Sequence, residues 1–171
     1  LSDNPQIDIY KFEYTIKKGK SKINIGDISS YLLYDTEDMY YKNELNSYYG
    51  FLWNTFFRYD IVSNIKFLED ISWCEDHIFS FLAFSKAKCM YISNKQYYLY
   101  NQDNIYSLSK KILDPYLIKK AAEEEFRVKK LCLTRSKPEV IDLLEKSFDS
   151  KIKFAIKNVY RKKMSFDERR K

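Results

Sequence analysis

Residues 71–84, ISWCEDHIFSFLAF, contain the clearest change of pattern in the chain. A polar step, Cys74-Glu75-Asp76-His77, interrupts apolar residues and is followed by large apolar side chains at partly helical spacing. This spacing predicts a helix over about residues 75–87. Glu75 and Asp76 then lie at or just before the first turn, where exposed backbone N–H groups and the helix dipole favour carboxylates by about 0.5 kcal/mol or more.

The acidic pair in this segment has two interpretations. Glu75 and Asp76 either stabilise the helix start alone, or present a carboxylate at the mouth of a pocket, where it can act as a base. His77 is the only histidine in the sequence. A multi-histidine metal site is therefore excluded, as is a Ser-His-Asp arrangement around any other histidine. As a structural residue, His77 would be a polar side chain in the first helical turn.

Length and composition indicate a globular domain. A chain of 171 residues with 45% hydrophobic and 32% charged residues can bury a core without disulfides or metals. Cys74, Cys89 and Cys132 are too few and too scattered for a disulfide framework, and they fit a reducing compartment. No apolar run approaches the roughly 20 residues of a membrane span, and we expect no signal peptide.

Short strands and helices are predicted on the N-terminal side of the acidic pair. Residues 7–25 indicate a β-hairpin with a turn at residues 17–20. Asp27 is expected to cap a helix over residues 28–33. The acidic residues 35–38 are a candidate metal site beside a diphosphate, but no buried strand leads into them, so they are predicted to form an exposed cap or loop before a short helix.

The sequence next to the acidic pair is aromatic and then strand-like. Residues 48–57, YYGFLWNTFF, form a dense aromatic run, and residues 60–66 are predicted to form a short helix capped by Asp60. Residues 89–93 and 96–100 are predicted to be two short strands joined by a tight turn at Asn94-Lys95. Gly-rich phosphate loops of the P-loop or Rossmann type are absent from the sequence.

The C-terminal part is helical and basic. We expect helices to begin at Asp114-Pro115 and to break near Ser136-Lys137-Pro138. Residues 114–171 carry 17 Lys and Arg against 10 Asp and Glu, whereas residues 1–113 carry 13 against 14. The sequence therefore predicts two regions, 1–113 and a basic helical tail, 114–171.

Residues 148–164 within this tail form an amphipathic helix pattern. Docking of its apolar side against the domain is the default interpretation. The alternative is a helix lying on an anionic membrane surface, where lysines and arginines gain electrostatic energy. Nucleic acid is not the expected partner, because no RNA-binding signature is present and the aromatic residues lie mainly in the acidic half.

Several motifs taken in order resemble the C-terminal half of bacterial family 2 glycosyltransferases with the GT-A fold. The motifs of that family are W-N-K-x-(F/Y)-R, a following Phe, an E-D pair opening a helix, a Y-x-Y strand and S-I-(S/T). In this sequence they correspond to Trp53-Asn54-Thr55-Phe56-Phe57-Arg58-Tyr59-Asp60, Ile65-Lys66-Phe67, Glu75-Asp76-His77-Ile78-Phe79, Tyr97-Tyr98-Leu99-Tyr100 and Ser107-Leu108-Ser109. The resemblance implies an α+β chain, with residues 1–113 as the acceptor-side part of a GT-A domain.

The chain departs from the family pattern at two motif positions. Thr55 stands where the family often has Lys, and Asn101 where it often has Arg. The sequence also contains no D-x-D motif, which in the family binds the metal and precedes this half. We therefore expect no cofactor in this chain and a divalent metal, Mg or Mn, with a nucleotide sugar in the full-length enzyme. The chain alone is expected to be inactive.

The resemblance implies transfer of a sugar to an acceptor saccharide in cell-surface polysaccharide synthesis, with inversion at the anomeric carbon. Asp76 matches the family's base, and Glu75 is expected to orient that base or the acceptor. The implied substrate-binding residues are Trp53, which can stack on a sugar, with Asn54, His77 and Arg58. The expected location is the cytoplasm, peripheral at the inner face of the membrane. A non-catalytic interaction or membrane-docking module is the alternative function.

Overall fold

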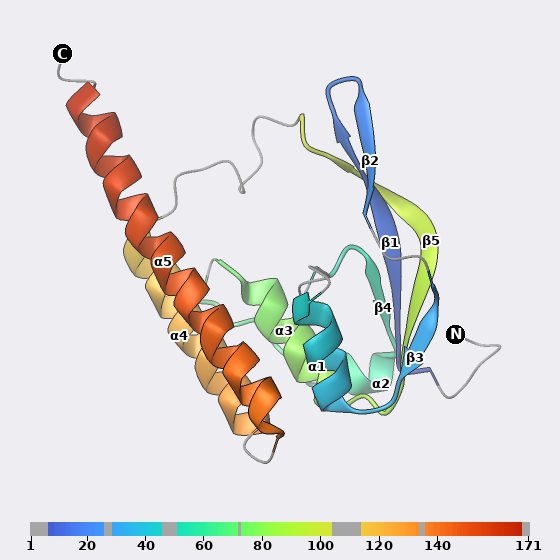
Figure 1. Ribbon diagram of the computed structural model, residues 1–171. Helices are drawn as coiled ribbons and strands as arrows, with labels where there is room; N and C mark the ends of the chain where they lie inside the picture. Colours follow the sequence, from blue (N-terminus) through green and yellow to red (C-terminus); the bar gives the residue numbers. More distant parts are fainter. Residues whose placement is uncertain are drawn as a thin grey trace. The chain divides into compact units, whose positions relative to one another are not determined.

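The computed structural model describes residues 7–25, 29–45, 51–71, 73–103, 114–133 and 136–168 (Figure 1). Helices and strands are mixed along the chain, which confirms the predicted α+β class. The chain forms two compact units. Unit 1 comprises Leu1–Phe67 and Asp76–Ile105, and unit 2 comprises Leu68–Glu75 and Tyr106–Lys171. The predicted boundary at residue 113 lies outside the described residues.

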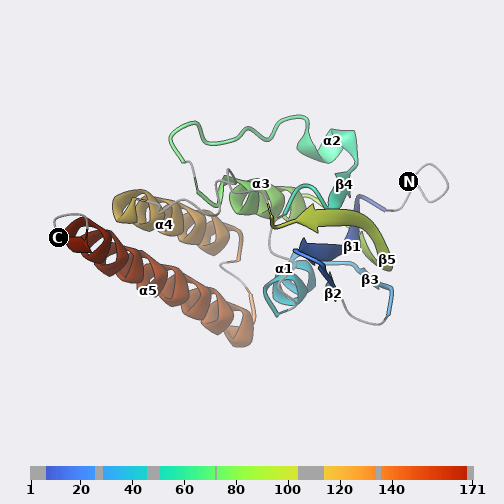
Figure 2. The same ribbon diagram turned by 90° about the horizontal axis from the view of Figure 1, so that it is seen from above.

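A five-stranded sheet forms the centre of unit 1 (Figure 2). Its strands are β1 (Ile9–Lys18), β2 (Ser21–Ile25), β3 (Tyr31–Leu33), β4 (Thr55–Phe57) and β5 (Met90–Asn101). Strand β1 is central: β5 runs parallel to it along one edge, and β4 and β2 pair antiparallel with successive parts of the other edge. Strand β3 pairs antiparallel with β5.

The predicted N-terminal hairpin is confirmed. Strands β1 and β2 pair from Tyr14 opposite Ile25 to Lys18 opposite Ser21. Gly19 in the turn has φ of +57°, a left-handed conformation that glycine adopts without the steric cost of a Cβ. A residue outside the hairpin also stabilises the turn: the Asp103 carboxylate accepts the Gly19 N–H at 2.8 Å.

The prediction of a helix over residues 28–33 is wrong for its described part. Tyr31–Leu33 is the short strand β3, in which Leu33 pairs with Met90 and is buried. Pairing with a sheet edge overrides the local helical pattern here. The expected cap, Asp27, lies outside the described residues. The next helix, α1 (Thr36–Leu45), begins where the acidic cluster was expected to act as a cap, and the Asp35 carboxylate accepts the Asp38 N–H at 2.8 Å.

The prediction of two short strands joined by a turn at Asn94-Lys95 is also wrong. Strand β5 is continuous, and its pairing with β1 shifts register at this point. Phe12 pairs with Ser93, whereas Glu13 pairs with Gln96. Because β5 pairs with the long parallel strand β1, Asn94 and Lys95 form a bulge within a continuous strand. They do not form the turn of a hairpin.

Helices α1 and α3 (Glu75–Phe84) lie on the same side of the sheet in Figure 1. They meet through an edge-to-face contact of Tyr40 with Phe81, whose centroids are 5.6 Å apart. The helix predicted over residues 60–66 is shorter in the structure, as α2 (Tyr59–Val62). Its N-cap is Arg58, without a side-chain cap; the predicted cap, Asp60, binds the Arg58 guanidinium instead.

Two antiparallel helices, α4 (Pro115–Cys132) and α5 (Pro138–Glu168), build most of unit 2. Asp114 caps α4 by accepting the Tyr116 N–H at 2.8 Å, with Pro115 at the first position, as predicted. The predicted break before Pro138 is confirmed. The two helices pack through Phe126 and Phe148, whose ring centroids are 4.7 Å apart.

Candidate functional site

The start of α3 places Asp76 and His77 in the first helical turn. The Asp76 Oδ1 atom accepts the backbone N–H of His77 at 2.9 Å and lies 4.0 Å from its Nε2 atom. The side chain of Asp76 is 31% exposed and that of His77 15% exposed. The carboxylate therefore satisfies a backbone donor of the helix start, as the capping interpretation predicts, and solvent also reaches it.

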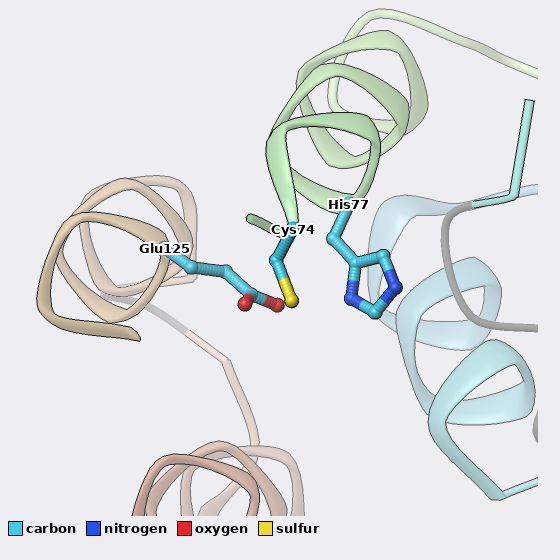
Figure 3. A group of neighbouring side chains, drawn as sticks. All are labelled: Cys74, His77 and Glu125. Carbon is cyan, nitrogen blue, oxygen red and sulfur yellow. The ribbon is translucent and has the colours of Figure 1, made fainter. Parts of the chain in front are cut away.

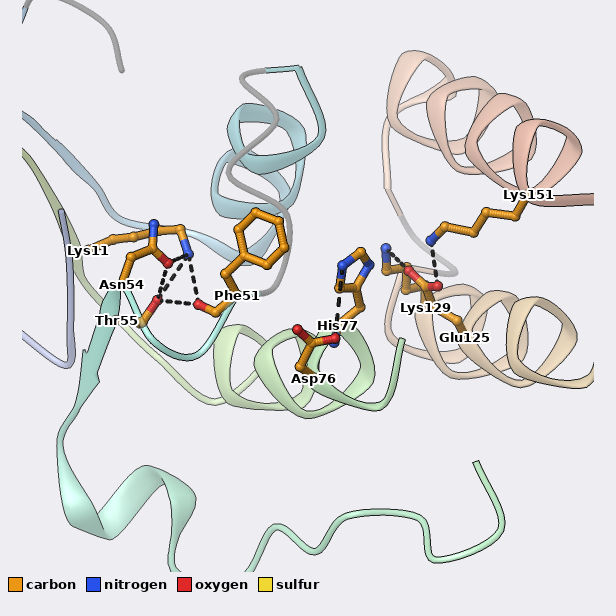
Figure 4. Close-up of polar contacts among 9 residues, drawn as sticks. All are labelled: Lys11, Phe51, Asn54, Thr55, Asp76, His77, Glu125, Lys129 and Lys151. Atoms are coloured by element: carbon orange, nitrogen blue, oxygen red, sulfur yellow. Dashed lines mark hydrogen bonds and ion pairs between the residues drawn. The ribbon is translucent and has the colours of Figure 1, made fainter. Parts of the chain in front are cut away.

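A buried lysine of strand β1 lies near this helix start (Figure 4). Lys11 of β1 is completely buried, and its Nζ donates to three neutral oxygens. These are the Thr55 hydroxyl at 2.9 Å, the Asn54 Oδ1 at 3.2 Å and the Phe51 carbonyl at 3.4 Å. Pairing of β1 with β4 fixes this arrangement, because Lys11 and Thr55 are opposite each other in register.

Burial and a nearby charge act on Lys11 in opposite directions. Burial lowers the pKa of the Lys11 amine from 10.5 to about 7, and the carboxylate of Asp76 opposes that effect. A change of charge at Lys11 therefore changes the electrostatic potential at Asp76, although the two residues belong to different elements. The amine changes its protonation state near neutral pH, which is unusual for a lysine.

Asn54 joins the aromatic loop to β1. It is completely buried, and its Nδ2 donates to the Phe12 carbonyl at 3.1 Å while its Oδ1 accepts from Lys11. The backbone repeats the connection, since the Phe12 N–H donates to the Asn54 carbonyl at 3.1 Å. Asn54 thus fixes the loop to β1, and both ends of its side-chain amide are hydrogen-bonded to protein groups.

Trp53 is the centre of an aromatic cluster. Four rings surround it: Phe51, Tyr98 and Tyr100 in stacked geometry at 5.0, 4.6 and 5.4 Å, and Tyr14 edge-on at 4.7 Å. Phe51 also meets the imidazole of His77 edge-to-face at 6.3 Å. The aromatic contacts therefore run continuously from the β1–β5 pair to the start of α3, and Trp53 is packed among rings.

Arg58 lies apart from this group. Its guanidinium pairs with Asp8 at 2.7 Å and with Asp60 at 2.7 Å. Asp8 is buried at the start of β1 and also accepts the backbone N–H groups of Lys88 and Cys89. Arg58 therefore fixes the beginning of β1 against the segment before β5, and the hydrogen bond from Arg58 lowers the pKa of Asp60.

The structure brings four of the six predicted site residues together. Trp53, Asn54, Asp76 and His77 are connected through Lys11 and Phe51, which the motifs did not indicate. Glu75, the first residue of α3, is half-buried beside Asp76 in sequence, and Arg58 is engaged elsewhere. Lys11 was missed because a lysine in an alternating strand ordinarily indicates the solvent face.

Unit 2 contains a second group of polar side chains, around the buried carboxylate of Glu125. The Cys74 sulfur and a Glu125 carboxylate oxygen lie within 4.8 Å of each other (Figure 3). His77, also drawn there, belongs to unit 1. Lys129 pairs with Glu125 at 2.7 Å, and Lys151 of α5 pairs with its other oxygen. The two lysines neutralise the buried carboxylate.

Comparison of the sequence with protein-family models finds no match, and comparison with curated proteins finds none.

Proposed function

We propose that unit 1 is the acceptor-side part of an inverting glycosyltransferase in which Asp76 is the general base. The observation that supports this most is the position of Asp76 at the start of α3, partly exposed, coupled to buried Lys11 and close to the aromatic cluster of Trp53. A base must be ionised and within hydrogen-bond reach of an acceptor hydroxyl. An aromatic wall beside it suits a saccharide, because sugar faces are apolar enough to pack on rings.

In the proposed reaction the acceptor hydroxyl loses its proton to the Asp76 carboxylate as its oxygen bonds to the anomeric carbon of the donor sugar. The bond from that carbon to the nucleoside diphosphate breaks in the same step, and the electron pair leaves with the diphosphate. A single displacement inverts the anomeric configuration. The donor and a divalent metal, Mg or Mn, which would neutralise the leaving diphosphate, would be held by the D-x-D half of the family fold.

The remaining residues have supporting parts in this proposal. Asn54 and Thr55 hold Lys11, and Lys11 provides a positive partner for Asp76 when protonated. Glu75 would orient the base or the acceptor. Trp53 would support the tyrosines of β5, which form the more exposed part of the aromatic cluster. The acceptor is a saccharide, the product a cell-surface polysaccharide and the place of action the cytoplasmic face of the membrane.

The substitution Asp76→Asn in the full-length protein tests this proposal. Asn keeps the shape and caps a helix nearly as well as Asp, but it cannot take a proton at neutral pH. Sugar transfer should fall at least about a hundredfold, while the melting temperature changes by only a few degrees. Asp35→Asn is the control, because the Asp35 carboxylate also accepts a backbone N–H at a helix start, that of Asp38 in α1, and Asp35 has no part in the proposed reaction. Near-normal transfer by Asp76→Asn would refute the assignment.

A further inference from the structure

The solvent side of α5 changes character along the helix. Side chains three and four residues apart share one face of a helix. On this face the first part of α5 presents three exposed carboxylates, Asp142, Glu145 and Asp149. The same line continues with four apolar residues, Ile152, Ile156, Val159 and Tyr160. We call these four residues the apolar stripe. Ile156, Val159 and Tyr160 are 51%, 49% and 65% exposed.

The apolar stripe is not the side of α5 that packs inside unit 2. In the same turns Ala155 and Asn158 are buried, and Lys151 reaches the buried carboxylate of Glu125. The amphipathic pattern of residues 148–164 predicts a single apolar side. The structure divides that side, so that part of it packs inside unit 2 and the stripe stays in solvent.

Basic residues accompany the apolar stripe. Lys153 and Lys157 are exposed next to it. From residue 151 to residue 164 the sequence contains six Lys and Arg and no Asp or Glu. Of the three whose side chains the structure describes, Lys151, Lys153 and Lys157, Lys151 pairs with Glu125 inside the unit. An exposed apolar stripe bordered by positive charge is complementary to a surface with apolar material below a layer of negative charge.

We propose that the second half of α5 binds flat on an anionic lipid surface. Ile156, Val159 and Tyr160 would enter the boundary between headgroups and acyl chains, and Lys153 and Lys157 would meet the negative headgroups. The carboxylates of the first half would be repelled, which restricts the contact to the second half. Among the described residues no helix has an apolar stretch long enough to cross a bilayer. Branched aliphatic side chains suit lipid better than nucleic acid, which favours flat aromatic partners.

Vesicle binding by the full chain tests the proposal. The chain should co-sediment with phosphatidylcholine vesicles that contain phosphatidylserine and not with pure phosphatidylcholine vesicles. Raising the salt from about 0.1 M to about 1 M shortens the Debye length from about 10 Å to about 3 Å and should release it. The double variants Lys153→Glu/Lys157→Glu and Ile156→Ser/Tyr160→Ser should each reduce the bound fraction at least about tenfold, because each removes one of the two sources of binding.

The double variant Lys119→Glu/Lys146→Glu is the matched control, since it changes net charge equally at exposed positions away from the stripe. It should bind within about threefold of wild type. Circular dichroism establishes that each variant remains folded, and a Val159→Trp reporter should shift its emission to the blue on anionic vesicles alone. The proposal is overturned if wild type ignores anionic vesicles at low salt, if the control weakens binding as much as Lys153→Glu/Lys157→Glu, or if polyuridylate binds more tightly and leaves the reporter unshifted.

Discussion

Burial lowers the pKa of the Lys11 amine to about 7, and the carboxylate of Asp76, in the first turn of α3, opposes this effect. The pair therefore connects the centre of the sheet to the helix start. It also makes the free energy of unfolding of unit 1 depend on pH.

Stability should rise with pH between about 7 and 10 because of Lys11. In this window the unfolded chain, with a lysine pKa of 10.5, binds more protons than the folded chain. The free energy of unfolding then increases by at most about 1.4 kcal/mol per pH unit. Below pH 7 both states are protonated and the penalty of burying the charge is fully present. Urea denaturation followed by tryptophan fluorescence at several pH values measures the slope.

Lys11→Met should remove this contribution, and Lys18→Met, at an exposed position of the same strand, should leave it unchanged. Burial raises the pKa of Tyr14 and of the Cys89 thiol, which acts in the opposite direction at alkaline pH. Only the difference between wild type and variant is therefore informative. Parallel pH profiles of wild type and Lys11→Met would contradict the prediction.

The buried carboxylate of Glu125 should be important for the stability of unit 2. Glu125→Ala leaves the buried ammonium of Lys129 without this partner, and removing one member of a buried pair costs about 3 to 5 kcal/mol. Glu124→Ala removes a carboxylate from an exposed pair with Arg127 on the same helix and should cost at most about 1 kcal/mol. Equal losses of unfolding free energy in the two variants, measured by chemical denaturation, would show that the buried pair contributes no more than the exposed pair.

Glu75→Gln should reduce sugar transfer by the full-length protein less than Asp76→Asn does. An orienting residue keeps much of its hydrogen bonding as Gln, whereas a base loses its only function as Asn. Comparison of kcat and KM for both variants, with melting temperatures measured in parallel, gives the ranking. The reverse order would mean that Glu75 is the base of the pair.

The chain by itself should not bind nucleotide sugars appreciably. Its sequence has neither a D-x-D motif nor a Gly-rich loop with which to hold a diphosphate and its metal. Calorimetric titration with UDP- and GDP-sugars in the presence of manganese is the measurement. Saturable binding with Kd below about 10 μM would place a donor site within this chain.

Local signals predicted the elements whose ends are set by their own residues. The turn at Gly19, the Asp114-Pro115 helix start and the helix opening at Glu75 depend on neighbours in sequence, and all are confirmed. Tyr31–Leu33 and the continuous β5 depend on a partner strand far away in sequence. A propensity pattern carries no information about such a partner, so these two predictions were wrong.

The candidate site shows the same division. The motif order indicated Asp76 and Trp53, which the fold brings into one group through Phe51 and His77. Lys11 belongs to the site because β4 pairs with β1 and encloses its amine. Burial of a charge is a property of the assembled sheet, and the sequence of a single strand does not contain it.

The bulge in β5 determines which side chains the sheet presents near Trp53. From Phe12 to Tyr14 β1 advances two residues, while β5 advances five, from Ser93 to Tyr98. Beyond the bulge Tyr98 pairs with Tyr14, and Tyr100 pairs with Ile16. Tyr98 and Tyr100 consequently share a face with Tyr14. Both tyrosines stack on Trp53, at 4.6 and 5.4 Å, so the extra residues of β5 select the rings of this strand that meet the tryptophan.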